Sequence, residues 1–175
     1  MSCLDPFKID LRALPEGITT VTLMEDDAYF TALEGSEVRG GCLRTVVTVN
    51  RLSDLFELTL HTEGTVTVAC DLCLDDMEQP ITVDDRVVAR LGDALSEEDD
   101  VIAVEEEEGI LDLAWIVYQS IYLGIPLRHV HAPGKCNPVM MRLLQEHSAV
   151  RSGDEDNEEH TDSRWDALKK IQLDN

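Results

Sequence analysis

The feature that most restricts the fold is a series of short alternating segments in the first half of the chain. In Phe56–Leu60 and Thr65–Val68, apolar residues recur at every second position with Thr or Glu between them, and Ile81, Val83 and Val87-Val88 continue the pattern. This period of two is typical of half-buried β-strands. No helical period separates the segments, which favours an antiparallel sheet with one apolar face and one polar face.

A different periodicity follows the alternating segments. Ile110, Leu113, Val117 and Ile121 repeat at helical spacing, and a glycine and a proline after them provide stop signals. Asn137 followed by a proline predicts the start of another helix. The expected fold class is therefore α+β: an antiparallel β-sheet, open or barrel-like, covered by one long helix, with short C-terminal helices.

The distribution of charge and proline suggests how the 175 residues are divided. Eight carboxylates between residues 96 and 108 indicate a solvated loop rather than a built metal site, because consecutive like charges lack fixed ligand geometry. We expect a single α+β domain over residues 1–150, with a β-rich part (7–91), an acidic loop (94–109) and a helix-and-clasp part (110–147). A flexible acidic linker (151–162) and a C-terminal amphipathic helix (163–175) are expected to follow it.

The charge of the chain limits its partners. Fourteen basic and thirty-six acidic residues give a net charge of −22, and such a field repels the phosphates of nucleic acids. A basic protein is the better electrostatic match, and we expect no DNA partner. No apolar run approaches the roughly 20 residues of a membrane span, and the N-terminal residues do not resemble a signal peptide. Both features predict a cytoplasmic protein that binds no membrane.

Cys70 and Cys73 form the sharpest motif, a Cys-x-x-Cys pair between two predicted strands. Five cysteines cannot all pair within one chain, so we expect reduced thiols. A structural zinc ion needs four ligands. His131 and Cys136, separated by a turn-forming Ala-Pro-Gly-Lys stretch, could complete a Cys₃His site, with His129 as the alternative nitrogen ligand.

Two other interpretations of the cysteine pair stay open. The cysteines could be reduced, partly buried residues without a metal. They could also form a thiol-disulfide redox pair, although such a pair requires a helix N-terminus to stabilise the thiolate. No glycine-rich phosphate loop or Ser-His-Asp arrangement is recognisable. We therefore expect no catalytic residues, no cofactor other than the structural zinc, and a protein that is not an enzyme.

The C-terminal end carries a candidate interaction motif. Trp165, Leu168 and Ile171 would lie on one side of a helix, and Lys169 and Lys170 lie near its end. Such a helix could bind a groove on a partner, with tryptophan as its anchor. The alternative is a helix that docks back on the domain.

The order of these motifs resembles a known family. A Val-x-Val-x-Cys-x-x-Cys segment ends at Cys73, an Asp-Leu helix runs into Ile-Tyr-Leu-Gly-Ile-Pro, His131 precedes Cys136, and an Arg-Trp-x-x-Leu-Lys-Lys motif lies near the C-terminus. This series is similar to the YceD-like proteins of bacteria and plastids, the large ribosomal RNA subunit accumulation proteins. The resemblance extends from Phe7 to Ile171 and is firmest from Val66 to Cys136.

The resemblance implies a function and a ligand choice. It implies a non-enzymatic ribosome-biogenesis factor that supports synthesis, processing or stability of large-subunit (23S) ribosomal RNA, with His131 rather than His129 as the ligand. With this charge, we expect a basic ribosomal protein or an RNA-processing enzyme as the partner. Direct RNA contact is disfavoured. It would use basic residues, namely Arg128, Lys135, Arg142, Lys169 and Lys170. The alternatives are an interaction module unrelated to RNA, with or without zinc, and a thiol-disulfide redox protein.

Overall fold

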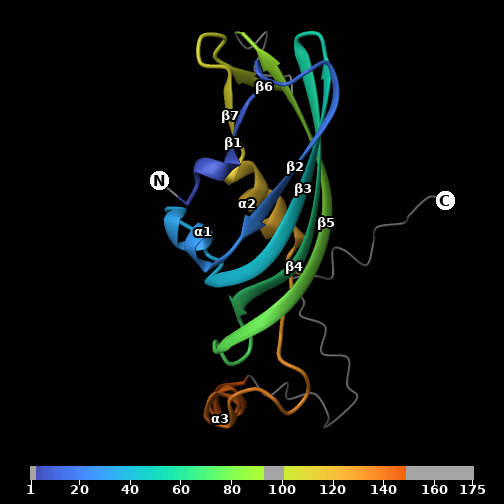
Figure 1. The fold of residues 1–175 in the computed structure, drawn as a ribbon. Coiled ribbons are helices and arrows are strands. Elements are labelled where there is room, and N and C mark those ends of the chain that lie inside the picture. Colours follow the sequence, from blue (N-terminus) through green and yellow to red (C-terminus); the bar gives the residue numbers. More distant parts are fainter. Residues whose placement is uncertain (1–2, 93–100, 149–175) are drawn as a thin grey trace, which may run out of the picture.

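The computed structural model describes residues 3–92 and 101–148. Within these ranges the strands form a five-stranded sheet, in the order β2-β3-β4-β5-β6, and a two-stranded sheet, β1-β7 (Figure 1). In chain order the elements are a 3-10 helix (Asp5–Phe7), β1 (Lys8–Asp10), β2 (Gly17–Glu25), α1 (Asp27–Ala32), β3 (Gly40–Leu52), β4 (Leu55–Ala69), β5 (Asp76–Leu91), β6 (Val101–Val104), β7 (Ile110–Asp112), α2 (Ala114–Gly124) and α3 (Pro138–His147).

The predicted alternation of apolar and polar residues is found in the strands of the large sheet. Val47 pairs with Leu60 and Val49 with Leu58 across β3 and β4, so their buried side chains share one face. The turn between these strands is very short and contains Ser53 at a φ of 57°. Strands β2 to β5 are antiparallel to their neighbours, whereas β6 pairs with β5 in parallel.

The core lies on the concave side of the curved sheet, where α1, α2 and the β1-β7 pair are found (Figure 1). Helix α2 lies directly against β5. The approach is so close that a Cβ atom added to Gly124 would be 3.2 Å from Cβ of Val83. Tyr29 of α1 stacks on Phe7 and donates a hydrogen bond of 2.7 Å to the carbonyl of Ala114 at the start of α2. These contacts join the N-terminal elements and α2 into one core with the sheet.

The predicted fold class is wrong. Strands β3, β4 and β5 have 13, 15 and 16 residues, whereas the helices α1, α2 and α3 have 6, 11 and 10, so the described chain is mostly β-sheet. No long helix covers the sheet in the described ranges. The sheet is also not a closed barrel, because β2 and β6 remain its two edges.

The helix is shorter than predicted because its first residues pair with a distant strand. Ile110, Leu111 and Asp112 form β7 and align with Asp10, Ile9 and Lys8 of β1. The helix begins only after them, where a side-chain oxygen of Asp112 accepts a hydrogen bond of 2.9 Å from the backbone N–H of Ala114. Helical spacing of apolar residues gives no information about a strand partner about one hundred residues away. Here the tertiary pairing overrides the local pattern.

The segment expected to be an acidic loop contains an ordered strand. Val101–Val104 forms β6, and a turn at Glu105–Gly109 connects it to β7. Helix α3 begins where predicted, since the Asn137 side chain accepts a hydrogen bond of 3.0 Å from Val139 N–H. The predicted partner-binding residues Trp165, Leu168, Lys169 and Lys170 lie outside the described ranges. None of the described helices has the length and hydrophobicity needed to cross a membrane.

Candidate metal centre

The connection between β4 and β5 is a tight turn that carries Cys70 and Cys73. We call residues 70–75 the knuckle. Cys70 N–H donates to the carbonyl of Asp75 (2.9 Å), and Leu74 N–H donates to the carbonyl of Cys70 (2.9 Å). Leu74 has a φ of 63°, an uncommon value for a branched residue that the turn imposes. The backbone thereby holds both cysteine side chains at the end of one long hairpin.

The segment after α2 returns to this knuckle. Asp71 N–H donates to the carbonyl of His129 (3.0 Å), and His129 N–H donates to Oδ2 of Asp71 (2.7 Å). The His129 ring also approaches Asp71, with Nε2 3.5 Å from Oδ1. This reciprocal pair fixes the position of residues 129–131 beside the cysteines.

Four ligand atoms converge at this point. Those of Cys70, Cys73, His131 and Cys136 all lie within 4.8 Å of one another. The sulfurs of Cys70 and Cys136 are 3.8 Å apart. Nδ1 of His131 lies 3.3 Å from the sulfur of Cys73 and 4.0 Å from that of Cys136. Residues 66 positions apart in the chain thus form one compact cluster.

The cluster has the donor types and spacing of a structural zinc site. For bonds of about 2.3 Å to sulfur and about 2.0 Å to nitrogen, the edges of a tetrahedron are about 3.8 Å for S···S and about 3.5 Å for S···N. The distances within the cluster lie close to these edges. Cys70 and Cys73 are fully buried, and Cys136 is partly buried. Three thiols and one imidazole fit zinc, which would leave no coordination position open.

Neighbouring backbone groups orient the ligands. Nε2 of His131 lies 3.2 Å from the carbonyl of Asp76. A proton on Nε2 would be donated to that carbonyl, which leaves Nδ1 free to face a metal. Burial raises the pKa of the Cys70 thiol, but backbone N–H groups of Cys73, His131 and Leu72 donate to its sulfur, and the pKa falls to about 6.

Cys136 shows the opposite behaviour. Burial raises the pKa of its thiol to about 11, and the hydrogen bonds and charges of Cys70 and Cys73 act in the same direction. Three thiolates in this volume would repel one another. A bound Zn²⁺ would remove that repulsion and hold all three thiols in the deprotonated form.

The structure brings together the predicted ligands Cys70, Cys73, His131 and Cys136. His129, the alternative nitrogen ligand, lies outside the cluster because its ring contacts Asp71 and lies 3.0 Å from the carbonyl of Pro126. The supporting roles of Asp71 and Asp76 were missed by the sequence analysis. Both roles, binding His129 and accepting from the His131 ring, depend on tertiary contacts. An aspartate within or beside a Cys-x-x-Cys motif gives no sequence signal of either role.

Comparisons with known proteins connect this site to a family. The family model described as "Large ribosomal RNA subunit accumulation protein YceD" matches residues 58–172, more than half of the chain and the part that contains all four ligands. No curated protein and no solved structure matches the chain. On the family match, the chain belongs to the YceD family of large ribosomal RNA subunit accumulation proteins.

Proposed function

We propose that this protein supports the synthesis, processing or stability of large-subunit ribosomal RNA as a non-enzymatic assembly factor that acts through basic protein partners. The family match over residues 58–172 carries the proposal, since the family is named for accumulation of that RNA. The proposed role places the protein in the cytoplasm.

The cluster supports a structural rather than a catalytic role for zinc. A catalytic zinc keeps one coordination position for water or substrate, whereas the chain provides four convergent ligands. Cys70 and Cys73 are buried and lie between two strands. A redox-active pair is instead accessible and placed at a helix N-terminus. In this proposal, zinc fixes the segment after α2 to the end of the β4-β5 hairpin.

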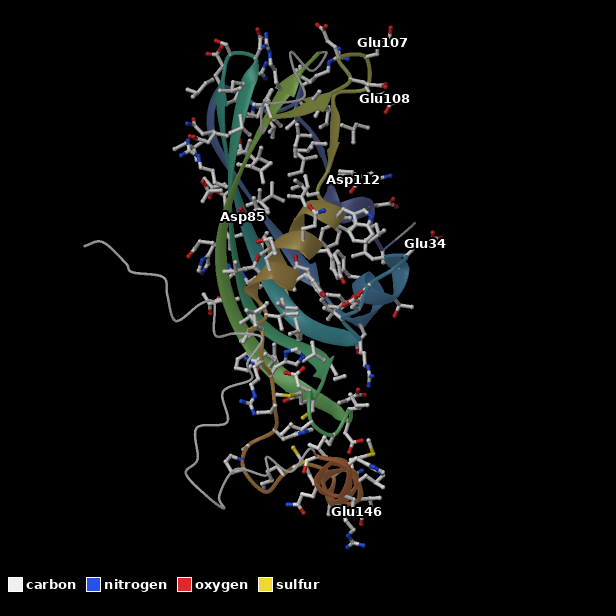
Figure 2. The ribbon with its side chains drawn as sticks, turned by 180° about the vertical axis from the view of Figure 1, so that it is seen from behind. Glu34, Asp85, Glu107, Glu108, Asp112 and Glu146 are labelled. Atoms are coloured by element: carbon white, nitrogen blue, oxygen red, sulfur yellow. The ribbon has the colours of Figure 1, made fainter. Side chains whose placement is uncertain are left out.

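The surface charge supports a basic partner. Figure 2 shows carboxylates along the whole length of the molecule, from Glu107 and Glu108 beside the β6-β7 turn, past Asp112 and Glu34, to Glu146 on α3. Three arginines already pair with carboxylates, namely Arg39 just before β3, Arg44 on β3 and Arg86 on β5. Such a surface attracts a basic protein and steers its approach in a salt-dependent way.

The central test is depletion of the protein, followed by profiles of ribosomal subunits and large-subunit RNA precursors. We expect fewer large subunits and accumulated or degraded precursors, with recovery when the intact chain is supplied again. Supply of a Cys73→Ser chain, which lacks one residue of the cluster, should restore the profile less well. The Cys42→Ser variant is its matched control, because Cys42 is exposed and lies outside the cluster. An unchanged subunit profile after depletion would refute the proposed function.

A second experiment addresses the partner. Pull-downs with the intact chain should recover a basic ribosomal protein or an RNA-processing enzyme, and recovery should fall as salt is raised. Gel shifts with large-subunit RNA fragments at low salt test the alternative of direct contact through Arg128, Lys135 and Arg142. RNA binding in the absence of any protein partner would contradict the proposed mechanism.

A further inference from the structure

An apolar groove lies beside the metal centre. We call it the α2 groove. It has a volume of about 440 Å³, within the range of pockets that hold ligands or a few side chains. Its lining comes from three parts of the chain: residues 37–38 before β3, residues 68–74 around the knuckle, and the end of α2 with residues 125–129.

The lining of this groove exposes several large apolar side chains. Leu123 is 82% exposed, Leu127 is 104% exposed and Leu74 is 60% exposed. No segment within residues 3–92 and 101–148 covers them. Exposed apolar side chains gathered around one groove often mark an interaction site. The α2 groove therefore has the character of a docking surface.

Carboxylates occupy the edge of the same groove. Glu37 accepts a hydrogen bond of 2.7 Å from the hydroxyl of Tyr122, and Asp71 faces His129 on the other part of the lining. An occupant with an apolar face and nearby positive charge would complement both the floor and the edge. A strongly acidic occupant would be repelled.

The chain itself contains a segment with these properties. Trp165, Leu168 and Ile171 are spaced three residues apart, a spacing that a helical conformation would present on one face. Lys169 and Lys170 adjoin this face and supply positive charge in a chain that is otherwise strongly acidic. Residues 163–171 lie outside the described ranges.

The tether makes binding within one chain favourable. Cys70 lines the α2 groove, and its sulfur is 3.8 Å from that of Cys136. Helix α3 starts two residues after Cys136 and has 10 residues, which corresponds to a length of about 15 Å. The 17 positions from Ser148 to Trp165 can span up to roughly 60 Å. A connection of this length gives an effective concentration near the millimolar range.

We propose that residues 163–171 dock in the α2 groove of the same chain, with Trp165 as the apolar anchor and Lys169 and Lys170 facing Glu37 and Asp71. The segment then covers Leu123 and Leu127 and shields the surface beside the metal centre. A basic partner protein with the same chemistry would have to displace it. This proposal does not depend on the proposed role in ribosomal RNA accumulation, because it concerns a contact within the purified chain.

Tryptophan fluorescence of the full chain tests the docking. The chain has two tryptophans, so Trp115→Phe leaves Trp165 as the sole reporter and keeps an aromatic ring beside Tyr118. We expect a blue-shifted emission and protection from acrylamide. Adding Leu123→Glu and Leu127→Glu should shift the emission to that of tryptophan in water. Both leucines are exposed, so these substitutions leave the core intact, which circular dichroism would verify.

A matched control separates the α2 groove from the other exposed apolar surface. Leu143→Glu with Leu144→Glu changes two exposed leucines of α3 and should leave Trp165 protected. Trp165 fully exposed in the full chain would overturn the proposal and leave the groove open to a partner. Protection of Trp165 from acrylamide that is lost only in the α3 variant would overturn the α2 groove as the docking site. Protection that disappears on dilution would show a second copy as the occupant and would also overturn it.

Discussion

Replacing Cys136 with serine tests what a metal at the four-ligand cluster contributes to the fold. Cys136 is partly buried, unlike the other two cysteines of the cluster, and serine has nearly the same shape. The substitution therefore removes one ligand without opening a cavity in the core. Any change in stability can then be assigned to the metal centre.

The structure allows the contribution of the metal to be compared with that of the other contacts. Beyond the four ligands, three hydrogen bonds hold residues 126–137 to the knuckle: two between Asp71 and His129, and one from Asn137 Nδ2 to Asp75 (3.1 Å). Such bonds contribute about 1 kcal/mol each, or about 1.5–3 kcal/mol with a charged partner, so together roughly 4–7 kcal/mol. Structural zinc contributes about 10–16 kcal/mol in isolated zinc fingers, so a metal bound at the cluster would contribute more than these hydrogen bonds.

We therefore expect Cys136→Ser to release residues 126–148 while the sheet stays folded. Among the described residues, the buried hydrophobic core ends at Ile121, and α3 contributes no buried residue. Hydrogen exchange should become faster at the backbone amides of Asp71 and His129, whereas the amides of β3 and β4 should keep their protection. Elemental analysis should find about one zinc per chain in the native protein and less in the variant.

Cys42→Ser is the control, since Cys42 is exposed and outside the cluster. It should retain zinc and the native exchange pattern. Chelator added to the native protein should reproduce the Cys136→Ser pattern. The reasoning is refuted if protein purified without oxygen contains no metal and if neither chelator nor Cys136→Ser alters exchange at residues 126–148.

Three further predictions concern the core. Burial raises the pKa of Glu25 from 4.5 to about 7, although the Thr45 side chain and a backbone N–H act to lower it. The folded state thus keeps a proton that the unfolded state releases, so the free energy of unfolding falls as the pH rises from about 4.5 to about 8. Over this range the Glu25→Gln variant should gain roughly 3 kcal/mol in free energy of unfolding relative to the native chain. The same pH dependence of stability in both proteins would contradict this. Leu58→Ala, at a fully buried position, should lower the free energy of unfolding by about 2–5 kcal/mol, whereas Leu52→Ala, at a 55% exposed position, should change it far less in the same urea titrations. Tyr29→Phe should cost about 0.5–1.5 kcal/mol because it removes the buried hydrogen bond from the phenol to the carbonyl of Ala114. Tyr122→Phe, which removes an exposed hydroxyl, is its control, and equal melting temperatures for the two variants would contradict this prediction.

The strands were predictable because their signal is local. In β4, the buried residues Phe56, Leu58 and Leu60 alternate with more exposed ones, and this follows directly from a backbone whose side chains point to opposite faces in turn. The start of α3 was also predictable, since Asn137 caps its own helix within two residues. Short-range geometry alone decides both features.

The fold class was wrong where a distant partner decided the structure. Ile110–Asp112 fits a helical period, but β1 offers a pairing edge that only the folded chain brings near. Val101–Val104 lies beside a run of carboxylates that indicated a loop, yet it adds to the edge of the sheet in parallel with Val88–Leu91. Neither pairing partner can be identified from local periodicity.

The candidate site divides in the same way. The chemistry of thiols and imidazoles identified Cys70, Cys73, His131 and Cys136 from the sequence, because few side chains bind zinc. The residues by themselves left His129 open as the nitrogen ligand. The folded chain decides between the histidines, since Asp71 binds the backbone and ring of His129 and leaves Nδ1 of His131 facing the cysteines.

The sequence by itself therefore determined the strand pattern, the acidic character and the donor set of the candidate metal centre. All three depend on residue type and on spacing over a few positions. Only the tertiary structure decided the open sheet, the short α2 and the α2 groove, and it places His131 at the cluster, as the family resemblance implied. The groove unites Glu37, Val68 and Leu123 from three separate segments, and long-range contacts of this kind depend on how the whole chain packs.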